Sequence, residues 1–540
     1  MSDVRDCSQD GPNRLQRWWF GPPLILVAIL YVLPLAGSAG ATNPNEVARI
    51  ELSTSIAFSA HLDIGSAAEF YGLSEDVSIR NGKIYSDKAP GLSLIAAPVM
   101  RIVNPLLPRA PSSDLPAYWP LRHVLTMVLV ALPAVGFAFL IGAAVPDQDP
   151  SKRTSFAVIA ALATPLWTYS TEFFGHVPSA LLVTLAWFTL LGFPGRRVSL
   201  SAGQAALGGA AAGFAVSTEY PTVLIVVVIF ATLLFRRTTF PILAYAIAGV
   251  IAGAIPALLY HQLAFGAPWI TGYGLKAHGD FQAIHEQGIL GVSLPKLESL
   301  WGVLFSARRG VLFYCPLLLL MPLGLWRMVE KRGWRDAGPI LMATAAYVLF
   351  AAGFVDWPAG WCAAARHLIP IVPLVAAIAL FGAAGLSEHR WGAAIVVILI
   401  TVSGANALLS IALTPYFPPE FGAPLAQLVL PSLADGAGFS NLLSSAIGVA
   451  PTVVVLLIGL IVIAALIWAA GRVVHDHMIW RSIISLTTVA VVLLIYSWQG
   501  STPKAETEVM RSEVLRRLGH TAVADRIDDS IRSAAIPATD

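Results

Sequence analysis

A charged turn, Ile84 to Gly91, stands where the chain passes from a long hydrophilic segment into apolar sequence. Asp87 and Lys88 come directly before Ala89-Pro90-Gly91, whose residue types favour a fixed turn. A cation held beside apolar sequence is costly unless an anion neutralises it. A phosphate suits a lysine ammonium, so Lys88 is a candidate phosphate ligand. The alternative is a salt bridge to Asp87 or Asp76.

Other polar residues stand at the ends of apolar runs. Arg309 and Arg366 each come just before an apolar run, where an arginine either binds an anionic headgroup or extends toward water. Glu172 and His176 are four residues apart, so on a helical turn they share one face. They are either substrate contacts or a hydrogen-bonded pair at a helix end. Glu219 ends a further run, with the same two interpretations.

The composition indicates a membrane protein. Hydrophobic residues make up 56% of the 540 residues, charged residues only 12%, and the mean hydropathy is +0.71. The apolar runs are continuous, which disfavours a β-barrel. A formal net charge of +2 with scattered cations gives no electrostatic case for nucleic-acid binding. The three cysteines have no spacing that suggests a metal site or a disulfide framework.

A membrane-spanning helix needs roughly 20 apolar residues, and about thirteen runs qualify. They predict an all-α, polytopic protein with spans near 20–39, 120–145, 154–170, 177–194, 202–218, 221–235, 240–262, 311–327, 338–354, 367–386, 392–413, 447–471 and 482–498. Short cytoplasmic loops collect Lys and Arg. Placing residues 1–19 in the cytoplasm puts the pairs Lys152-Arg153, Arg196-Arg197 and Arg236-Arg237 inside.

The same topology divides the chain into a transmembrane region, 20–498, and a polar tail, 499–540, on the outer side. The long loops 40–119, 263–310 and 414–446 also face outward. Within the first loop, Glu46 to Ala60 is amphipathic and predicts a helix along the membrane surface. The apolar stretch Gly91 to Leu107 contains Pro98 and Pro105, so we expect it to be interfacial or re-entrant. A short amphipathic helix interrupted by Gly519 is predicted in the tail.

The inside N-terminus, the long first outer loop and the Asp87-Lys88-Ala89-Pro90 segment resemble the GT-C superfamily of membrane glycosyltransferases. The branch in question contains protein O-mannosyltransferases and aminoarabinose transferases, whose members carry an Asp-Lys-Pro-Pro-like segment. The Arg309-Gly310 and Arg366 span entries add to the resemblance. The family has an Asp at the start of loop one, whereas this chain has Asn43-Pro44-Asn45-Glu46.

This resemblance implies transfer of a sugar from a polyprenyl-phosphate donor to a lipid, glycan or protein acceptor. The charge pattern of the loops predicts that the reaction takes place on the outer face. The high Ala and Gly content and the short loops favour a bacterial inner membrane. The resemblance makes Glu46 the base for the acceptor hydroxyl, with Asp63 or Asp76 as alternatives. Glu172 or His176 matches the family's loop-two acid, and Lys88, Arg366 and Arg309 would bind the phosphate.

No cofactor is implied with certainty, although a divalent cation is possible. The alternative function is a transporter or flippase of lipid-linked sugars, which predicts ionisable residues in the middle of spans. Here the charges instead gather at the outer ends of spans.

Overall fold

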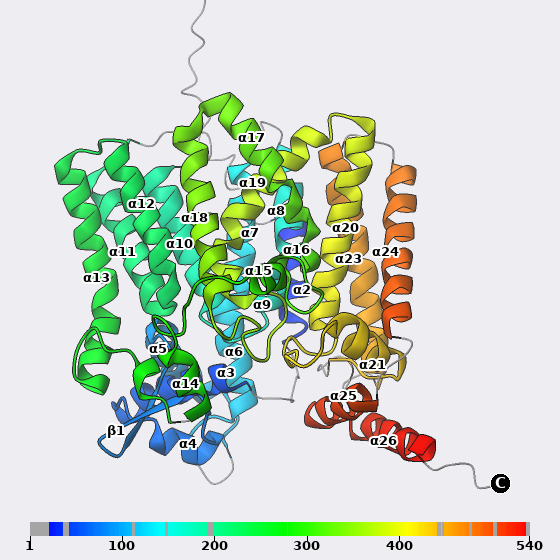
Figure 1. The fold of residues 1–540 in the computed structure, drawn as a ribbon, viewed down its shortest axis with the longest axis horizontal. Coiled ribbons are helices and arrows are strands. Elements are labelled where there is room, and N and C mark those ends of the chain that lie inside the picture. Colours follow the sequence, from blue (N-terminus) through cyan, green and yellow to red (C-terminus); the bar gives the residue numbers. More distant parts are fainter. Residues whose placement is uncertain are drawn as a thin grey trace, which may run out of the picture.

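The computed structural model describes residues 21–35, 43–110, 114–145, 150–192, 199–277, 279–439, 444, 448–474, 478–500 and 505–535. Nearly all of its regular structure is helical, arranged as a bundle of upright helices (Figure 1). Within the described residues, seven helices are long and apolar enough to cross a membrane: Tyr118–Ala144, Phe240–Phe265, Trp334–Gly353, Arg366–Leu386, Arg390–Ala412, Pro451–Val474 and Trp480–Gly500. The chain is therefore a multi-pass membrane protein.

Within the described residues, the predicted spans fall on helices of this bundle, although several of these helices are shorter than a full span. The bundle helices are α2 (Pro22–Val32), α6 (Tyr118–Thr126), α7 (Leu132–Ala144), α8 (Pro150–Leu162), α9 (Pro165–Tyr169), α10 (His176–Leu191), α11 (Ala202–Thr218), α12 (Val223–Phe235), α13 (Phe240–Phe265), α16 (Val311–Tyr314), α17 (Met321–Arg332), α18 (Trp334–Gly353), α19 (Val372–Leu386), α20 (Arg390–Ala412), α23 (Pro451–Val474) and α24 (Met478–Gly500).

Glycines allow α11 and α13 to pack with their backbones in contact. A Cβ atom on Gly209 would lie 2.0 Å from the carbonyl oxygen of Ala246, and one on Gly253 would lie 2.3 Å from that of Ala210. Small residues permit this close approach between membrane helices. The tight pair fixes the end of α11, which Glu219 follows.

The long loops and the tail gather at one end of the bundle, at the bottom of Figure 1. This end is called the loop-one end, and the turn between α17 and α18 lies at the opposite end. The elements at the loop-one end are α3 (Pro44–Thr54), α4 (Gly65–Tyr71), β1 (Val77–Arg80), β2 (Lys83–Ser86), α5 (Gly91–Val103), α14 (Gly279–Glu286), α21 (Leu430–Ala434), α25 (Ala505–Arg517) and α26 (Thr521–Ala535). Helix α15 (Leu297–Leu304) lies nearer the middle. The compartment that this end faces stays a prediction.

The loop-one elements differ from the expected surface helices in two ways. Every residue of α3 after Pro44 is buried, so this helix lies inside the protein rather than with one face in lipid. The antiparallel hairpin of β1 and β2, paired from Val77 with Ser86 to Arg80 with Lys83, was not predicted. Its turn is Asn81-Gly82, with φ of 51° and 72°, the residue pair that a two-residue hairpin turn favours.

Candidate active site

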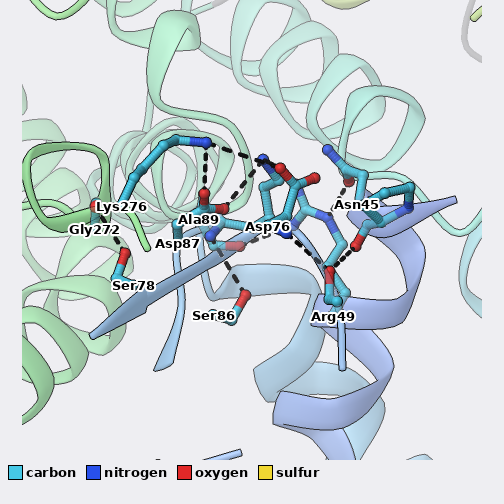
Figure 2. A network of polar contacts seen from close by, with 12 residues as sticks. Asn45, Arg49, Asp76, Ser78, Ser86, Asp87, Ala89, Gly272 and Lys276 are labelled. Atoms are coloured by element: carbon cyan, nitrogen blue, oxygen red, sulfur yellow. Dashed lines mark hydrogen bonds and ion pairs between the residues drawn. The ribbon is translucent and has the colours of Figure 1, made fainter. Parts of the chain in front are cut away.

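The Asp87-Lys88 turn directly follows β2, and Lys88 is paired with carboxylates there. Lys88 Nζ lies 3.0 Å from Asp76 Oδ1 and 3.1 Å from Asp87 Oδ1. A second lysine, Lys276, lies 2.7 Å from Asp87 Oδ2 and 3.8 Å from Asp76 Oδ1 (Figure 2). The four side chains, called the charge quartet, sum to a formal charge of zero. The salt bridges expected as the alternative for Lys88 are thus present, to both aspartates at once.

Within the quartet, the opposite charges favour the ionised forms of Asp76 and Lys88 despite their burial. Burial alone would raise the pKa of Asp76, but the ammonium groups of Lys88 and Lys276 bring that pKa below its usual value. Burial opposes the charge of Lys88 in the same way, and the two carboxylates hold its pKa above the usual range.

The quartet also attaches loop 263–310 to the hairpin. Ser78 Oγ donates to the carbonyl of Gly272 at 2.7 Å, and the backbone N–H of Ala277 donates to Val77 at 3.0 Å. The ring of Tyr273 lies 5.8 Å from Lys88 Nζ and 5.6 Å from Lys276 Nζ. Lys276 therefore positions Asp87 from a segment almost two hundred residues away in sequence.

Arg49, which is almost fully buried, joins three parts of the site. Its guanidinium donates to Asn45 Oδ1 at 3.0 Å, to the carbonyl of Ala89 at 2.8 Å and to Glu219 Oε1 at 2.7 Å. Helix α3 is thereby tied both to the turn that carries Lys88 (Figure 2) and to the end of α11. A Cβ on Gly91 would lie 2.6 Å from Thr218 Oγ1, so only glycine permits this approach.

Glu46 lies one turn before Arg49 and is buried in an ion pair with Arg122 of α6. Arg122 Nη2 lies 2.8 Å from Oε1, and Nε lies 3.2 Å from Oε2. The same guanidinium donates to the carbonyl of Thr171 at 2.8 Å and to Tyr416 Oη at 2.9 Å. The backbone N–H of Phe173 also donates to Glu46 Oε1. Glu46 therefore contacts loop two, the segment between α9 and α10, directly at Phe173.

Two of the predicted site residues lie in local hydrogen-bond networks. Asp63 Oδ1 accepts from the backbone N–H groups of Gly65 at 3.0 Å and Ile84 at 3.3 Å, which joins the start of α4 to β2. The guanidinium of Arg309 is fully buried, and its three nitrogens all donate to backbone carbonyls, those of residues 308, 358, 360 and 417. These contacts describe a structural role for both side chains.

Four other polar side chains meet without partners. Several of their buried atoms have no hydrogen-bond partner: both carboxylate oxygens of Glu172, both ring nitrogens of His176, Arg366 Nε and His367 Nε2. The two imidazole rings lie 6.1 Å apart, and Arg366 opens the helical turn η8 (Arg366–Ile371), which packs against α10. These side chains, Glu172, His176, Arg366 and His367, are called the unpartnered cluster.

Arg366 is the free cation of this cluster. The structure records no ion pair or hydrogen bond for its half-buried side chain within the described residues. Its charge acts on Asp76, Lys88 and Glu172, which places the cluster beside the charge quartet. Burial, reinforced by the negative charge of Glu46, raises the pKa of Glu172 well above its usual value. The buried carboxyl of Glu172 and the unpaired guanidinium of Arg366 thus lie among polar atoms that lack hydrogen-bond partners.

Glu219 borders the same cluster. Its Oε1 lies 3.6 Å from His176 Nδ1, and a Cβ on Gly175 would lie 2.5 Å from that oxygen. Among the described residues, no group of three or more His, Cys, Asp or Glu side chains is arranged to hold a metal ion. Cys315 and Cys362 are free and buried.

Sequence reasoning named Lys88, Glu46, Glu172, His176 and Arg366, which the structure brings to the loop-one end. It missed three residues that position them, Arg49, Arg122 and Lys276, and it missed His367 of the unpartnered cluster. A signal existed for Arg122, because an arginine inside an apolar run is costly and therefore marks a functional or structural contact. No local signal pointed to Lys276, whose partners are remote in sequence.

The chain is similar to solved structures, among them two of the same protein. No protein-family model matches the chain, and no curated protein matches it. The chain is similar to ArnT from Cupriavidus metallidurans in the apo state, with a TM-score of 0.46 and 16% identity over 86% of this chain and 76% of that one. It is also similar to the same protein bound to undecaprenyl phosphate, with a TM-score of 0.42 and 17% identity over 86% of this chain and 77% of that one.

Proposed function

We propose that this chain is a membrane glycosyltransferase that moves a sugar from a polyprenyl-phosphate-linked donor to an acceptor hydroxyl. The observation that carries the proposal is the unpartnered cluster at the loop-one end of an apolar bundle. Unsatisfied buried polar atoms are rare in proteins, and a bound ligand is one explanation for several in one place. The apolar helices offer lipid-facing surface for a polyprenyl tail, and Arg366 offers its phosphate a guanidinium that is unpaired among the described residues.

The reaction needs a cation for the leaving phosphate and a base for the acceptor. As the bond from the sugar carbon to the phosphate oxygen breaks, Arg366 would stabilise the charge that develops on phosphate, with Lys88 as the second cation. The acceptor oxygen forms the new bond to the sugar carbon and gives its proton to a carboxylate. The resemblance to the GT-C superfamily supplies the donor class.

Glu46 is our choice of base among the three acids of loop one. It contacts the backbone of loop two next to Glu172, whereas Asp63 joins α4 to β2 and Asp76 belongs to the charge quartet. Glu172 and His176 would contact the sugar or the phosphate. We place the reaction on the outer face of a bacterial inner membrane, because the charge pattern of the short loops puts the loop-one end outside.

The test uses the purified protein in nanodiscs with a panel of radiolabelled polyprenyl-phosphate sugars. Release of polyprenyl phosphate is measured for the wild type and for Arg366→Gln. Loss of one preorganised cation should lower the rate about 100-fold or more. Arg109→Gln is the matched control, because Arg109 is exposed and its guanidinium bonds, among the described residues, to Asn104 and the carbonyl of Asp114.

Two results would contradict the proposal. One is equal donor cleavage by the wild type and Arg366→Gln across the panel. The other is movement of intact lipid-linked sugar across sealed vesicles without any cleavage, which would favour the transporter.

A further inference from the structure

A second group of unpartnered polar atoms lies on helix α3, the turn after it and the start of α6. Both carboxylate oxygens of Glu51, Ser55 Oγ and Tyr118 Oη are buried, and none has a hydrogen-bond partner. Glu51 and Ser55 are four residues apart where α3 continues into the π-helical turn Ser55–Ser59, so they share one side of this helix. Tyr118 is the first residue of α6. These three side chains are called the Glu51 group.

Aromatic rings lead from the Glu51 group toward the surface. The ring of Tyr71 packs edge-on against that of Tyr118, with centroids 5.7 Å apart, and Tyr118 packs edge-on against Trp119 at 5.2 Å. All three rings are half-buried, which means that part of each is accessible. The group therefore borders the solvent side of the loop-one end through aromatic faces.

The chemistry of the group is that of uncharged hydrogen bonding. No cation pairs with Glu51, and burial raises the pKa of its carboxyl to about 8, so the group is mainly neutral at pH 7. A neutral carboxyl, a hydroxyl and a phenol each offer a donor and acceptors. No cation is paired with these three side chains, whereas a ring with several hydroxyls would satisfy their polar atoms and stack on the aromatic rings.

The group and the cation are both linked to Glu46. Arg366 acts on Glu172, Glu172 is next to the Phe173 N–H that binds Glu46, and the charges of Glu46 and Glu51 both act on Tyr118. The sequence of contacts thus runs from a phosphate-binding cation, past the proposed base, to the uncharged group. In a direct glycosyl transfer the acceptor oxygen attacks the sugar carbon from the face opposite to the leaving phosphate, and the base lies beside the acceptor hydroxyl.

We propose that Glu51, Ser55 and Tyr118 form a binding site for a polyhydroxylated ring, which is the acceptor in the transfer reaction. This assignment rests on the proposed function. One ring hydroxyl would approach Glu46, lose its proton to that carboxylate and bond to the donor sugar as the phosphate leaves. The remaining hydroxyls would bond to the Glu51 group.

The test measures binding of methyl glycosides to the full-length protein in nanodiscs by saturation-transfer NMR. Three methyl hexosides are the probes, and undecaprenyl phosphate binding is measured in parallel on the same samples. Tyr118→Phe and Ser55→Ala each remove one hydroxyl, and we expect each to weaken glycoside binding about tenfold with undecaprenyl phosphate affinity unchanged. Tyr245→Phe is the matched control, because Tyr245 is 49% exposed on α13.

The outcomes separate this inference from the proposed function. Glycoside binding that is absent from the wild type, or equal in the wild type and both variants, overturns the acceptor site. Glycoside binding that depends on these hydroxyls without any undecaprenyl phosphate binding supports the site and counts against the transferase. Ser55→Ala removes a single oxygen, so it keeps the test decisive if Tyr118→Phe does not fold.

Discussion

Glu51 should make the folded protein less stable as the pH rises. Its carboxyl is fully buried with no partner for either oxygen, and burial raises its pKa from 4.5 to about 8. The folded state therefore keeps a proton that the unfolded chain has released. Below pH 4 both states are protonated and the group contributes nothing. Above the unfolded pKa the penalty grows with pH, and it levels off once the pH passes the folded pKa.

The size of the effect follows from the shift. A difference of this extent between folded and unfolded pKa corresponds to a full penalty of about 5 kcal/mol, as an order of magnitude. Part of this penalty is already present at pH 6. Between pH 6 and pH 9 we therefore expect the free energy of unfolding to fall by about 2 to 3 kcal/mol because of this one carboxyl.

The assay is equilibrium unfolding by added SDS in mixed micelles, followed by tryptophan fluorescence at several pH values. Glu51→Gln carries no ionisable group at this position, so its stability should lose that part of the pH dependence and exceed that of the wild type at pH 9. Glu75→Gln is the control, since Glu75 is an exposed glutamate in the same loop. An equal loss of stability with pH in the wild type and Glu51→Gln would refute the reasoning.

Two further substitutions probe the links that hold the site together. Arg122→Ala should lower the free energy of unfolding by about 3 to 5 kcal/mol in the same assay, because it leaves the buried Glu46 carboxylate unpaired. Adding Glu46→Gln should recover part of this loss. No recovery would contradict a buried ion pair. Gly91→Ala should cost about 1 to 3 kcal/mol and reduce donor cleavage, because the new Cβ would lie 2.6 Å from Thr218 Oγ1 and 2.7 Å from the Ser217 carbonyl. Gly136→Ala, with nothing within 4 Å, should match the wild type, and a Gly91→Ala variant equal to it would refute the close approach.

The bundle could be predicted from sequence because its signal is local. A run of apolar residues long enough to cross a membrane is visible in one window, and the described helices fall on these runs. The interior of loop one was less accessible to such reasoning. Its amphipathic segment from Glu46 suggested a helix on lipid, but α3 buries Arg49 and Glu51 inside the protein because α4, α5 and the hairpin surround it.

The candidate site shows the same division between local and remote information. Glu172 and His176 were found from their four-residue spacing, and Arg366 from its place before an apolar run. Only two of the three charged partners in the quartet of Lys88 could be predicted from the sequence. Asp76 and Asp87 lie nearby in sequence, but Lys276 arrives with a segment that docks on β1. A contact across so many residues leaves no pattern in one sequence.

The pairing in the charge quartet changes the expected roles of Lys88 and Arg366. Lys88 already neutralises Asp76 and Asp87 together with Lys276, so a phosphate that binds it must compete with two carboxylates. Arg366 has no such competitor within the described residues, and its guanidinium offers paired donors that suit a phosphate. The phosphate should therefore bind first to Arg366. Lys88 then acts mainly by fixing the turn beside it, and a second contact forms only as negative charge grows on the leaving group.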